Sequence, residues 1–289
     1  MKKSQKLLRW LNRVQQKHHV SAFTVAVIKK YNDDGAGRHA VLLTYYSFLS
    51  LFPLLLILTT LVDSLIGNDA HVRSVIIKGV TNYFPLLGSQ LSNHVHRLHG
   101  YGVALISGLI FILYGTRGVA NAFTNGVQSI WEISDEHRDK FPKTLYKNLP
   151  LVFFGGLGLI IASVLASLAS AAGKGIDFRI ISVAVNLFIL FWLFRLLLDL
   201  SLPRHISFKE TRAGAAAAAI GLVTLQIIGG YVLSHELKHL SALYSYFALT
   251  LGLLFWLYLQ SQVLYYSIEV AIVSSRKMWP RNLIDPKTT

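Results

Sequence analysis

The chain has 289 residues, of which 53% are hydrophobic and only 15% are charged. Soluble domains carry about 25% charged residues, so this composition argues against an ordinary soluble enzyme. Cysteine is absent, which excludes a disulfide framework, a thiolate nucleophile and a cysteine-ligated zinc or iron–sulfur centre. The 28 basic and 14 acidic residues give a formal charge of +14, and a charge of this sign attracts either nucleic acid or anionic lipid.

The first 38 residues predict a cytoplasmic, basic amphipathic segment. Between residues 2 and 38, nine Lys and Arg residues alternate with apolar side chains, a pattern typical of a helix that lies on a membrane surface. The first long apolar run begins only at Ala40, beyond the window of an ordinary signal peptide. We therefore expect the first apolar span to remain in the mature protein.

Six apolar stretches follow, and each is long enough to cross a hydrocarbon layer of about 30 Å as a helix. They predict an all-α fold: a polytopic bundle of six transmembrane helices in one membrane domain, residues 39–275, followed by a cytoplasmic tail, residues 276–289. An apolar pattern between the first two spans predicts short extracytoplasmic helices there. The predicted spans are about 40–62, 101–123, 150–173, 180–200, 213–234 and 240–270.

The basic residues outside the spans predict the orientation. Twenty of them lie in the N-terminal segment, the loops after spans two and four and the C-terminal tail, whereas six lie in the opposite loops. This asymmetry places both termini in the cytoplasm of a bacterial inner membrane protein. The expected partners of the surplus charge are membrane lipids of the anionic inner leaflet rather than nucleic acid. No phosphate-binding G-x-x-x-x-G-K-[ST] motif occurs, and no cofactor is predicted.

Four charged residues fall inside predicted spans: Arg117, Arg195, Asp199 and Glu269. Their three spans all run from outside to inside, so each charge lies in the inner-leaflet half of the membrane. Charged side chains at that depth are costly. One interpretation is a polar vestibule, facing the cytoplasm, that attracts an anionic group. The other is snorkelling at helix ends, with an i, i+4 pair between Arg195 and Asp199. The sequence leaves both open.

Residues 235–239 read His-Glu-Leu-Lys-His, a literal H-E-x-x-H. On a helix, this spacing places the imidazoles of His235 and His239 one turn apart for zinc, with Glu236 as general base. A third protein ligand is required, and His94, His96 and His99 lie on the same predicted side. A solvated polar loop is the preferred interpretation, so no metal site is predicted.

The run from Thr44 to Leu55, T-Y-Y-S-F-L-S-L-F-P-L-L, resembles the first-span signature of the YihY/BrkB membrane protein family. Later elements are similar to that family's motifs in the same order, over roughly residues 20–275. Ser245 and Ser267-Ile268 depart from the family pattern, which has Gly and Gly-Ala there. The residues that carry the resemblance are Tyr45, Pro53, Pro85, Trp131, Pro203, Gly214, Tyr244, Trp256 and Glu269.

The resemblance implies a six-helix, multipass inner-membrane protein that is transporter-like or handles envelope lipids, with a small molecule or lipid as substrate. Two alternatives stay open. One is a membrane-embedded hydrolase, either a zinc protease through residues 235–239 or the ribonuclease of an old family name. The other is a non-catalytic membrane scaffold. Ribonuclease activity is disfavoured because the cytoplasmic acids resemble loop charges rather than a converging metal site. We do not expect an enzyme, and no catalytic residue is assigned.

Overall fold

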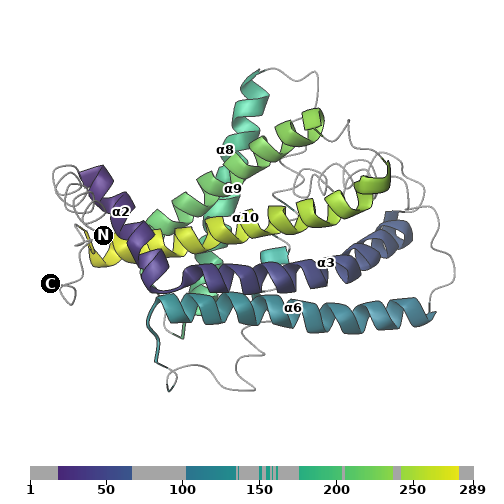
Figure 1. The fold of residues 1–289 in the computed structure, drawn as a ribbon, viewed down its shortest axis with the longest axis horizontal. Coiled ribbons are helices and arrows are strands. Elements are labelled where there is room, and N and C mark those ends of the chain that lie inside the picture. The colour runs from purple at the N-terminus through teal and green to yellow at the C-terminus, as the bar shows by residue number, and fades with distance from the viewer. Residues whose placement is uncertain are drawn as a thin grey trace.

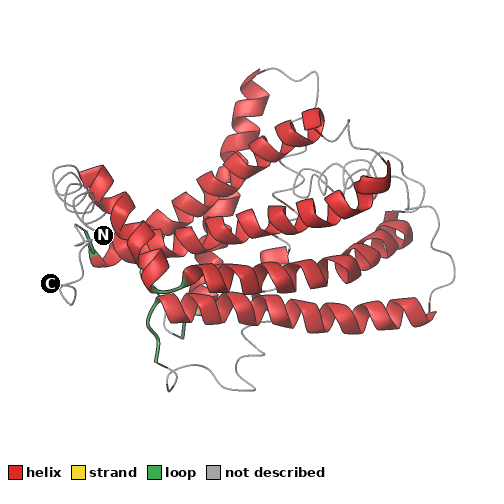
Figure 2. Ribbon diagram, in the orientation of Figure 1, coloured by secondary structure: helices red, strands yellow, loops and turns green. Residues whose placement is uncertain are grey.

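The described residues of the computed structural model form helices with short turns and loops, and contain no strand (Figures 1 and 2). This confirms the predicted all-α class. The described residues are 19–66, 102–134, 136, 150–151, 154–156, 158, 161, 176–203, 206–236 and 242–279. The helices are α2 (His19–Asp33), α3 (Ala36–Ile66), α6 (Gly102–Ile130), α8 (Ile176–Ser201), α9 (Phe208–Glu236) and α10 (Ala242–Arg276).

Five of these helices correspond to predicted spans, and each extends beyond its span at one end or at both. The longest of the described helices is α10, which has 35 residues and is therefore about 52 Å long at 1.5 Å per residue. It exceeds a hydrocarbon layer of about 30 Å, so at least one end of α10 reaches beyond that layer. The predicted third span, 150–173, is described only at scattered residues, and the count of six spans stays a prediction.

The helix ends have local causes in the sequence. Gly35 ends α2, because its φ of +64° is a left-handed conformation that glycine adopts without strain. At the end of α8, Pro203 lacks the N–H that another helical turn would need. There the Ile206 N–H donates to Asp199 Oδ1 at 3.2 Å, which satisfies a backbone donor in the connection to α9.

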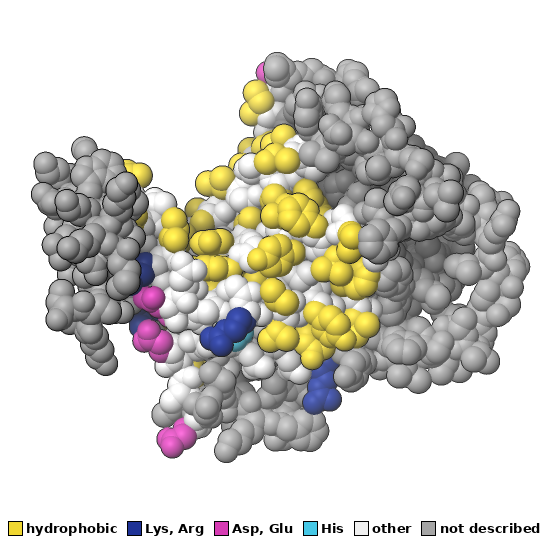
Figure 3. All heavy atoms as spheres, in the orientation of Figure 1, with side chains coloured by type: hydrophobic (Ala, Val, Ile, Leu, Met, Phe, Trp, Pro, Cys, Tyr) yellow, Lys and Arg dark blue, Asp and Glu magenta, His cyan; other side chains and the backbone are white. Residues whose placement is uncertain are grey.

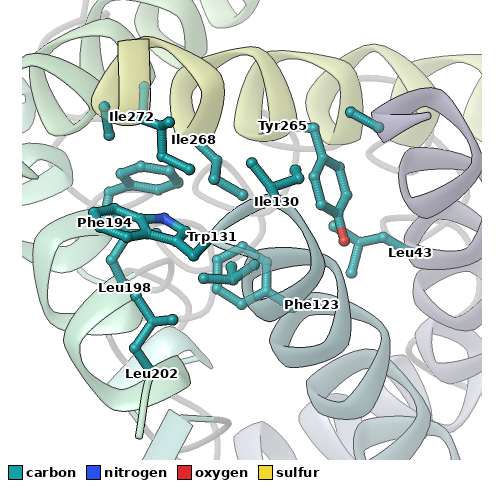
Figure 4. Packing of buried hydrophobic residues seen from close by; sticks show 14 of the residues in the cluster. Leu43, Phe123, Ile130, Trp131, Phe194, Leu198, Leu202, Tyr265, Ile268 and Ile272 are labelled. Atoms are coloured by element: carbon teal, nitrogen blue, oxygen red, sulfur yellow. The ribbon is translucent and has the colours of Figure 1, made fainter. Parts of the chain in front are cut away.

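The helices pack around α10, which contacts α9 on one side and α3 on another, while α6 packs against α3 and α8 against α9 (Figure 1). The main core lies where α3, α6, α8, α9 and α10 approach each other (Figure 4). The approach of α9 to α10 is close: a Cβ on Gly214 would lie 2.5 Å from the Ser267 carbonyl oxygen and 2.6 Å from the Ala271 Cβ. A small residue is required at this crossing.

Large apolar side chains cover much of the exterior. Phe188 on α8, Ile227 on α9 and Phe255 on α10 are each at least 60% exposed, and hydrophobic side chains spread over the face drawn in Figure 3. Among the described residues, two stretches, Ile180–Ser201 and Phe208–Gly229, are long and apolar enough to cross a membrane, and only 22% and 33% of them are buried. Contiguous exposed apolar surface of this kind indicates a hydrophobic neighbour, which for membrane helices is lipid.

Candidate functional site

Polar side chains form two rows along α10, each with a spacing of four residues. Because side chains at i and i+4 lie on the same face of a helix, each row faces one direction. Together they turn a polar side of α10 toward α2, α3 and α6, within a helix that is largely apolar. The first row is Tyr258, Gln262 and Tyr266, and the second is Ser261, Tyr265 and Glu269.

The first row meets Tyr31 of α2. The Tyr31 hydroxyl donates to Gln262 Oε1, and the Tyr31 ring stacks on Tyr266 with 4.0 Å between centroids and 8° between planes. Tyr31 lies outside the predicted spans and is buried. Burial raises its pKa to about 12, helped by the nearby Tyr266 and, to a smaller extent, by the charge of Glu269. The phenol is therefore a neutral hydrogen-bond donor at physiological pH.

The second row faces α3 and α6. Thr44 Oγ1 donates to Ser261 Oγ at 3.1 Å, and the Tyr265 hydroxyl donates to the Ala122 carbonyl oxygen at 3.1 Å. Glu269 is fully buried. An ionisable residue buried in a helix of a membrane protein is by default a candidate functional residue.

A hollow of about 390 Å³ opens beside the first row, at the turn between α2 and α3. We call it the Arg38 hollow. Its volume is within the range of about 300–1,000 Å³ that is usual for small-ligand sites. Arg38, the third residue of α3, is exposed there. The full lining is Tyr31, Asn32, Gly35, Gly37, Arg38, Val41 and Tyr258.

Four charged residues form an ionic cluster that joins α2, α10 and the end of α6. Lys30 is 1% exposed; its ammonium lies 2.5 Å from Asp34 Oδ2 and 3.5 Å from Glu132 Oε1. Arg276 Nη1 lies 2.9 Å from Glu132 Oε2, and its Nη2 donates to the Trp131 carbonyl oxygen. The hydrogen bond from Arg276 lowers the pKa of Glu132, and the charge of Lys30 adds to this effect. Glu132 therefore stays ionised at neutral pH.

The four predicted intramembrane charges have different surroundings. Arg117 is exposed on α6. The Arg195 guanidinium lies 5.3 Å from the centroids of both the Trp192 and Phe208 rings. Asp199 caps the connection to α9, and Glu269 is fully buried in α10. The vestibule formed by all four stays a prediction.

Several of the residues that carry the family resemblance have structural roles. Trp131 is buried in the core, Pro203 ends α8, and Gly214 lies at the α9–α10 crossing. Trp256 is also buried, and a Cβ on Gly229 would lie 2.3 Å from its ring, so these two positions pack tightly. Tyr45 is 58% exposed on α3. Of the others, Pro53 and Tyr244 lie within α3 and α10 without described side chains, and Pro85 lies outside the described residues.

The H-E-x-x-H motif lies at the C-terminal end of α9. His235 and Glu236 are the last residues of that helix, and His239 lies outside the described residues, as do His94, His96 and His99. Within the described ranges, no three His, Asp or Glu side chains gather closely enough to hold a metal ion. Zinc binding by the motif is therefore not tested by this structure.

Sequence reasoning missed both the polar rows of α10 and the ionic cluster. The signal for the rows is present as Ser, Gln and Tyr recurring every four residues from Tyr258 to Glu269, but uncharged polar residues of this kind are also common in membrane helices that have no binding site. The ionic cluster joins residues that are more than 100 positions apart, Lys30 with Glu132 and Glu132 with Arg276. No local pattern pairs them.

Comparison with known proteins finds similarity to one family of bacterial membrane proteins. A family model described as "Virulence factor BrkB" matches residues 27–289. The inner membrane protein YhjD of Escherichia coli K12 is 24% identical over 277 residues, covering 84% of this chain and 78% of that protein. An uncharacterized protein of Dickeya dadantii is 25% identical, covering 75% and 72%. A UPF0761 membrane protein of a Psychrobacter species is 22% identical; the match covers 86% of this chain but 48% of that protein. No solved structure matches the chain.

Proposed function

This chain belongs to the virulence factor BrkB family of membrane proteins, and on that premise we propose that it handles an anionic amphiphile of the bacterial envelope. We place it in the inner membrane with both termini in the cytoplasm. The amphiphile is an envelope lipid or a related molecule with a charged head and an apolar tail. The chain acts on it as a carrier or binding protein rather than as a hydrolase.

The observation that carries this proposal is the polar side of α10 within a bundle whose exterior is apolar. The first row lines the Arg38 hollow through Tyr258, and a fully buried carboxyl group, Glu269, lies in the second row. A scaffold needs no polar rows inside its membrane helices, because each buried polar group costs free energy unless it is paired. A protein that binds a polar head and leaves an apolar tail in lipid needs both surfaces.

The hydrolase alternatives have no comparable support among the described residues. The polar groups of α10 are chiefly phenols, hydroxyls and amides, which bind a ligand but lack the paired nucleophile and base that hydrolysis needs. The scaffold alternative makes a different prediction from ours, since a scaffold leaves the lipid composition of each membrane unchanged.

The test is lipid profiling of a strain that lacks the gene, compared with its parent and with strains complemented by variants. We expect an altered content or distribution of phosphate-bearing amphiphiles, which the wild-type chain restores and Glu269→Gln does not. Asp177→Asn, at an exposed position of α8, is the matched control and should restore the profile. Size-exclusion chromatography in detergent confirms that both variants fold. A profile that does not change on deletion would refute the proposed function and favour the scaffold.

A further inference from the structure

We propose that the Arg38 hollow binds the phosphate group of an anionic amphiphile whose apolar tail follows the outer faces of α3 and α10. This inference rests on the proposed function and names the headgroup that the chain recognises. The reasons are the charge in the hollow, the neutral donors around it and the apolar surface that leads away from it.

Arg38 supplies the charge. Its guanidinium presents N–H donors in a planar fork that matches phosphate oxygens. It is the charged residue among those that line the hollow. The acid nearest in sequence, Asp34, lies 2.5 Å from the Lys30 ammonium, so its charge is largely compensated.

The backbone of the α2–α3 turn leaves room for an anion. Gly35 and Gly37 both line the hollow without side chains. A Cβ on Gly35 would lie 2.5 Å from Arg38 Nη2, so glycine allows the guanidinium to lie back over the turn. Arg38 also stands in the first turn of α3, a helix of 31 residues, where the helix dipole favours negative charge. The helix dipole adds to the attraction that the Arg38 guanidinium exerts on an anion, but it would not form a binding site without Arg38.

Neutral donors complete the hollow. Tyr258 brings a phenol from α10, and Asn32 brings a carboxamide from the end of α2. The third polar side chain, Tyr31, donates its hydroxyl to Gln262. Tyr31 therefore fixes the wall of the hollow, while Tyr258 and Asn32 can turn toward a ligand.

An apolar path begins at the edge of the hollow. Val41 lines it and is 54% exposed, and Tyr45 and Leu49, four and eight residues further along α3, are 58% and 38% exposed. On α10, Leu254 and Phe255 are exposed one turn before Tyr258. A free phosphate ion would make no favourable contact with this apolar surface. An acyl chain attached to the phosphate would bury it, gaining about 25 cal/mol for each Å² of apolar area removed from water.

The experiment uses the full chain, purified in a neutral detergent, and dioctanoyl phosphatidic acid as the probe in isothermal titration calorimetry. Dioctanoylglycerol carries the same chains without phosphate, and inorganic phosphate carries the charge without chains. We expect phosphatidic acid to bind at least tenfold more tightly than either. Equal binding of dioctanoylglycerol would overturn the role of the phosphate, and equal binding of inorganic phosphate would overturn the role of the tail.

Variants locate the site. Arg38→Gln should weaken phosphatidic acid binding by about 10- to 100-fold, the loss expected for one charge-assisted hydrogen bond. Arg212→Gln removes a guanidinium that is also exposed, in the N-terminal part of α9, and should change affinity less than about twofold. Equal losses in the two variants would show that net charge alone attracts the lipid and would overturn the site. No loss in Arg38→Gln would do the same.

Tyr258→Phe keeps the proposal testable if Arg38→Gln does not fold, and it should weaken binding by about threefold to tenfold through loss of one neutral hydrogen bond. Unchanged affinity in that folded variant would then refute the site.

The site and the proposed function can be refuted separately. Specific phosphatidic acid binding with an unchanged lipid profile on deletion refutes the proposed function and leaves the site. An altered profile without phosphatidic acid binding refutes the site alone.

Discussion

The contact between Gly126 and Tyr265 allows a sharp test of the packing of α6 against α10. Tyr265 is fully buried, and a Cβ on Gly126 would lie 2.2 Å from its hydroxyl oxygen and 2.5 Å from its Cε1. The ring must therefore move in Gly126→Ala. Its hydrogen bond to the Ala122 carbonyl oxygen is then lost or strained.

The magnitude follows from three terms. Overpacking a buried site costs about 1–3 kcal/mol, and loss of the hydrogen bond costs about 1 kcal/mol. The higher helix propensity of alanine returns about 1 kcal/mol. We expect Gly126→Ala to lower the free energy of unfolding by about 1–3 kcal/mol, which corresponds to a fall in melting temperature of several degrees.

Gly156 provides the matched control, because a Cβ there would have no heavy atom within 4 Å. Gly156→Ala should leave the melting temperature unchanged or raise it slightly. Both variants and the wild type are compared in the same detergent by intrinsic fluorescence during heating. If Gly126→Ala melts at the same temperature as Gly156→Ala, the close α6–α10 approach is wrong.

Three further predictions follow from the charges and the topology. The pKa of Glu132 is lowered, so the stabilising effect of its charge is complete above the ordinary pKa of 4.5 and is lost as pH falls through the lowered value. The difference in melting temperature between wild type and Glu132→Gln should therefore be constant from pH 8 to 5 and should shrink in more acidic buffer. Arg195→Gln removes the cation from the Trp192 and Phe208 rings and should cost about 0.5–2 kcal/mol of stability in thermal melts, whereas no change would show that these contacts contribute nothing. The chain has no native cysteine, so single variants can be labelled cleanly: Lys277→Cys should resist an impermeant maleimide in intact spheroplasts and Asp177→Cys should react, and the reverse pattern would overturn the predicted orientation.

The helical framework could be predicted because membrane helices need long apolar runs, and such runs are readable from a single chain. The helix ends were harder. The predicted second span stops at residue 123, whereas α6 continues to Ile130. The added turns carry Thr124 and Gln128, which looked like loop residues but are both buried. Gln128 Nε2 donates to the Ser201 carbonyl oxygen at 2.9 Å. Contact with α8, rather than hydropathy, therefore explains why this segment continues the helix.

The candidate site was less predictable for the same reason. In the sequence, Arg38 is one of nine basic residues of a predicted surface segment, whereas its position in the first turn of α3 follows from the left-handed turn at Gly35. A Gly-Ala-Gly sequence does not reveal which helix ends and which begins. The joining of Tyr31 to Gln262, 231 residues away in the chain, depends on how α2 packs against α10. The periodicity of residues within each helix carries no information about how the two helices pack against each other.

The ionic cluster contributes to the packing of α2 against α10. Lys30 and Tyr31 are neighbours at the end of α2, and each contacts a different partner: Lys30 lies 3.5 Å from Glu132 and Tyr31 binds Gln262. Glu132 in turn binds Arg276 in the last turn of α10. The end of α2, which forms one wall of the Arg38 hollow, is therefore linked to α10 directly through Tyr31 and indirectly through Glu132. Because Lys30 and Tyr31 are adjacent, the direction of α2 also depends on contacts further back along it, where Val27 packs against Val273 and the Phe23 ring meets the Trp279 ring edge-on. The hollow keeps its shape because the charges at the end of the bundle position the phenol that lines it.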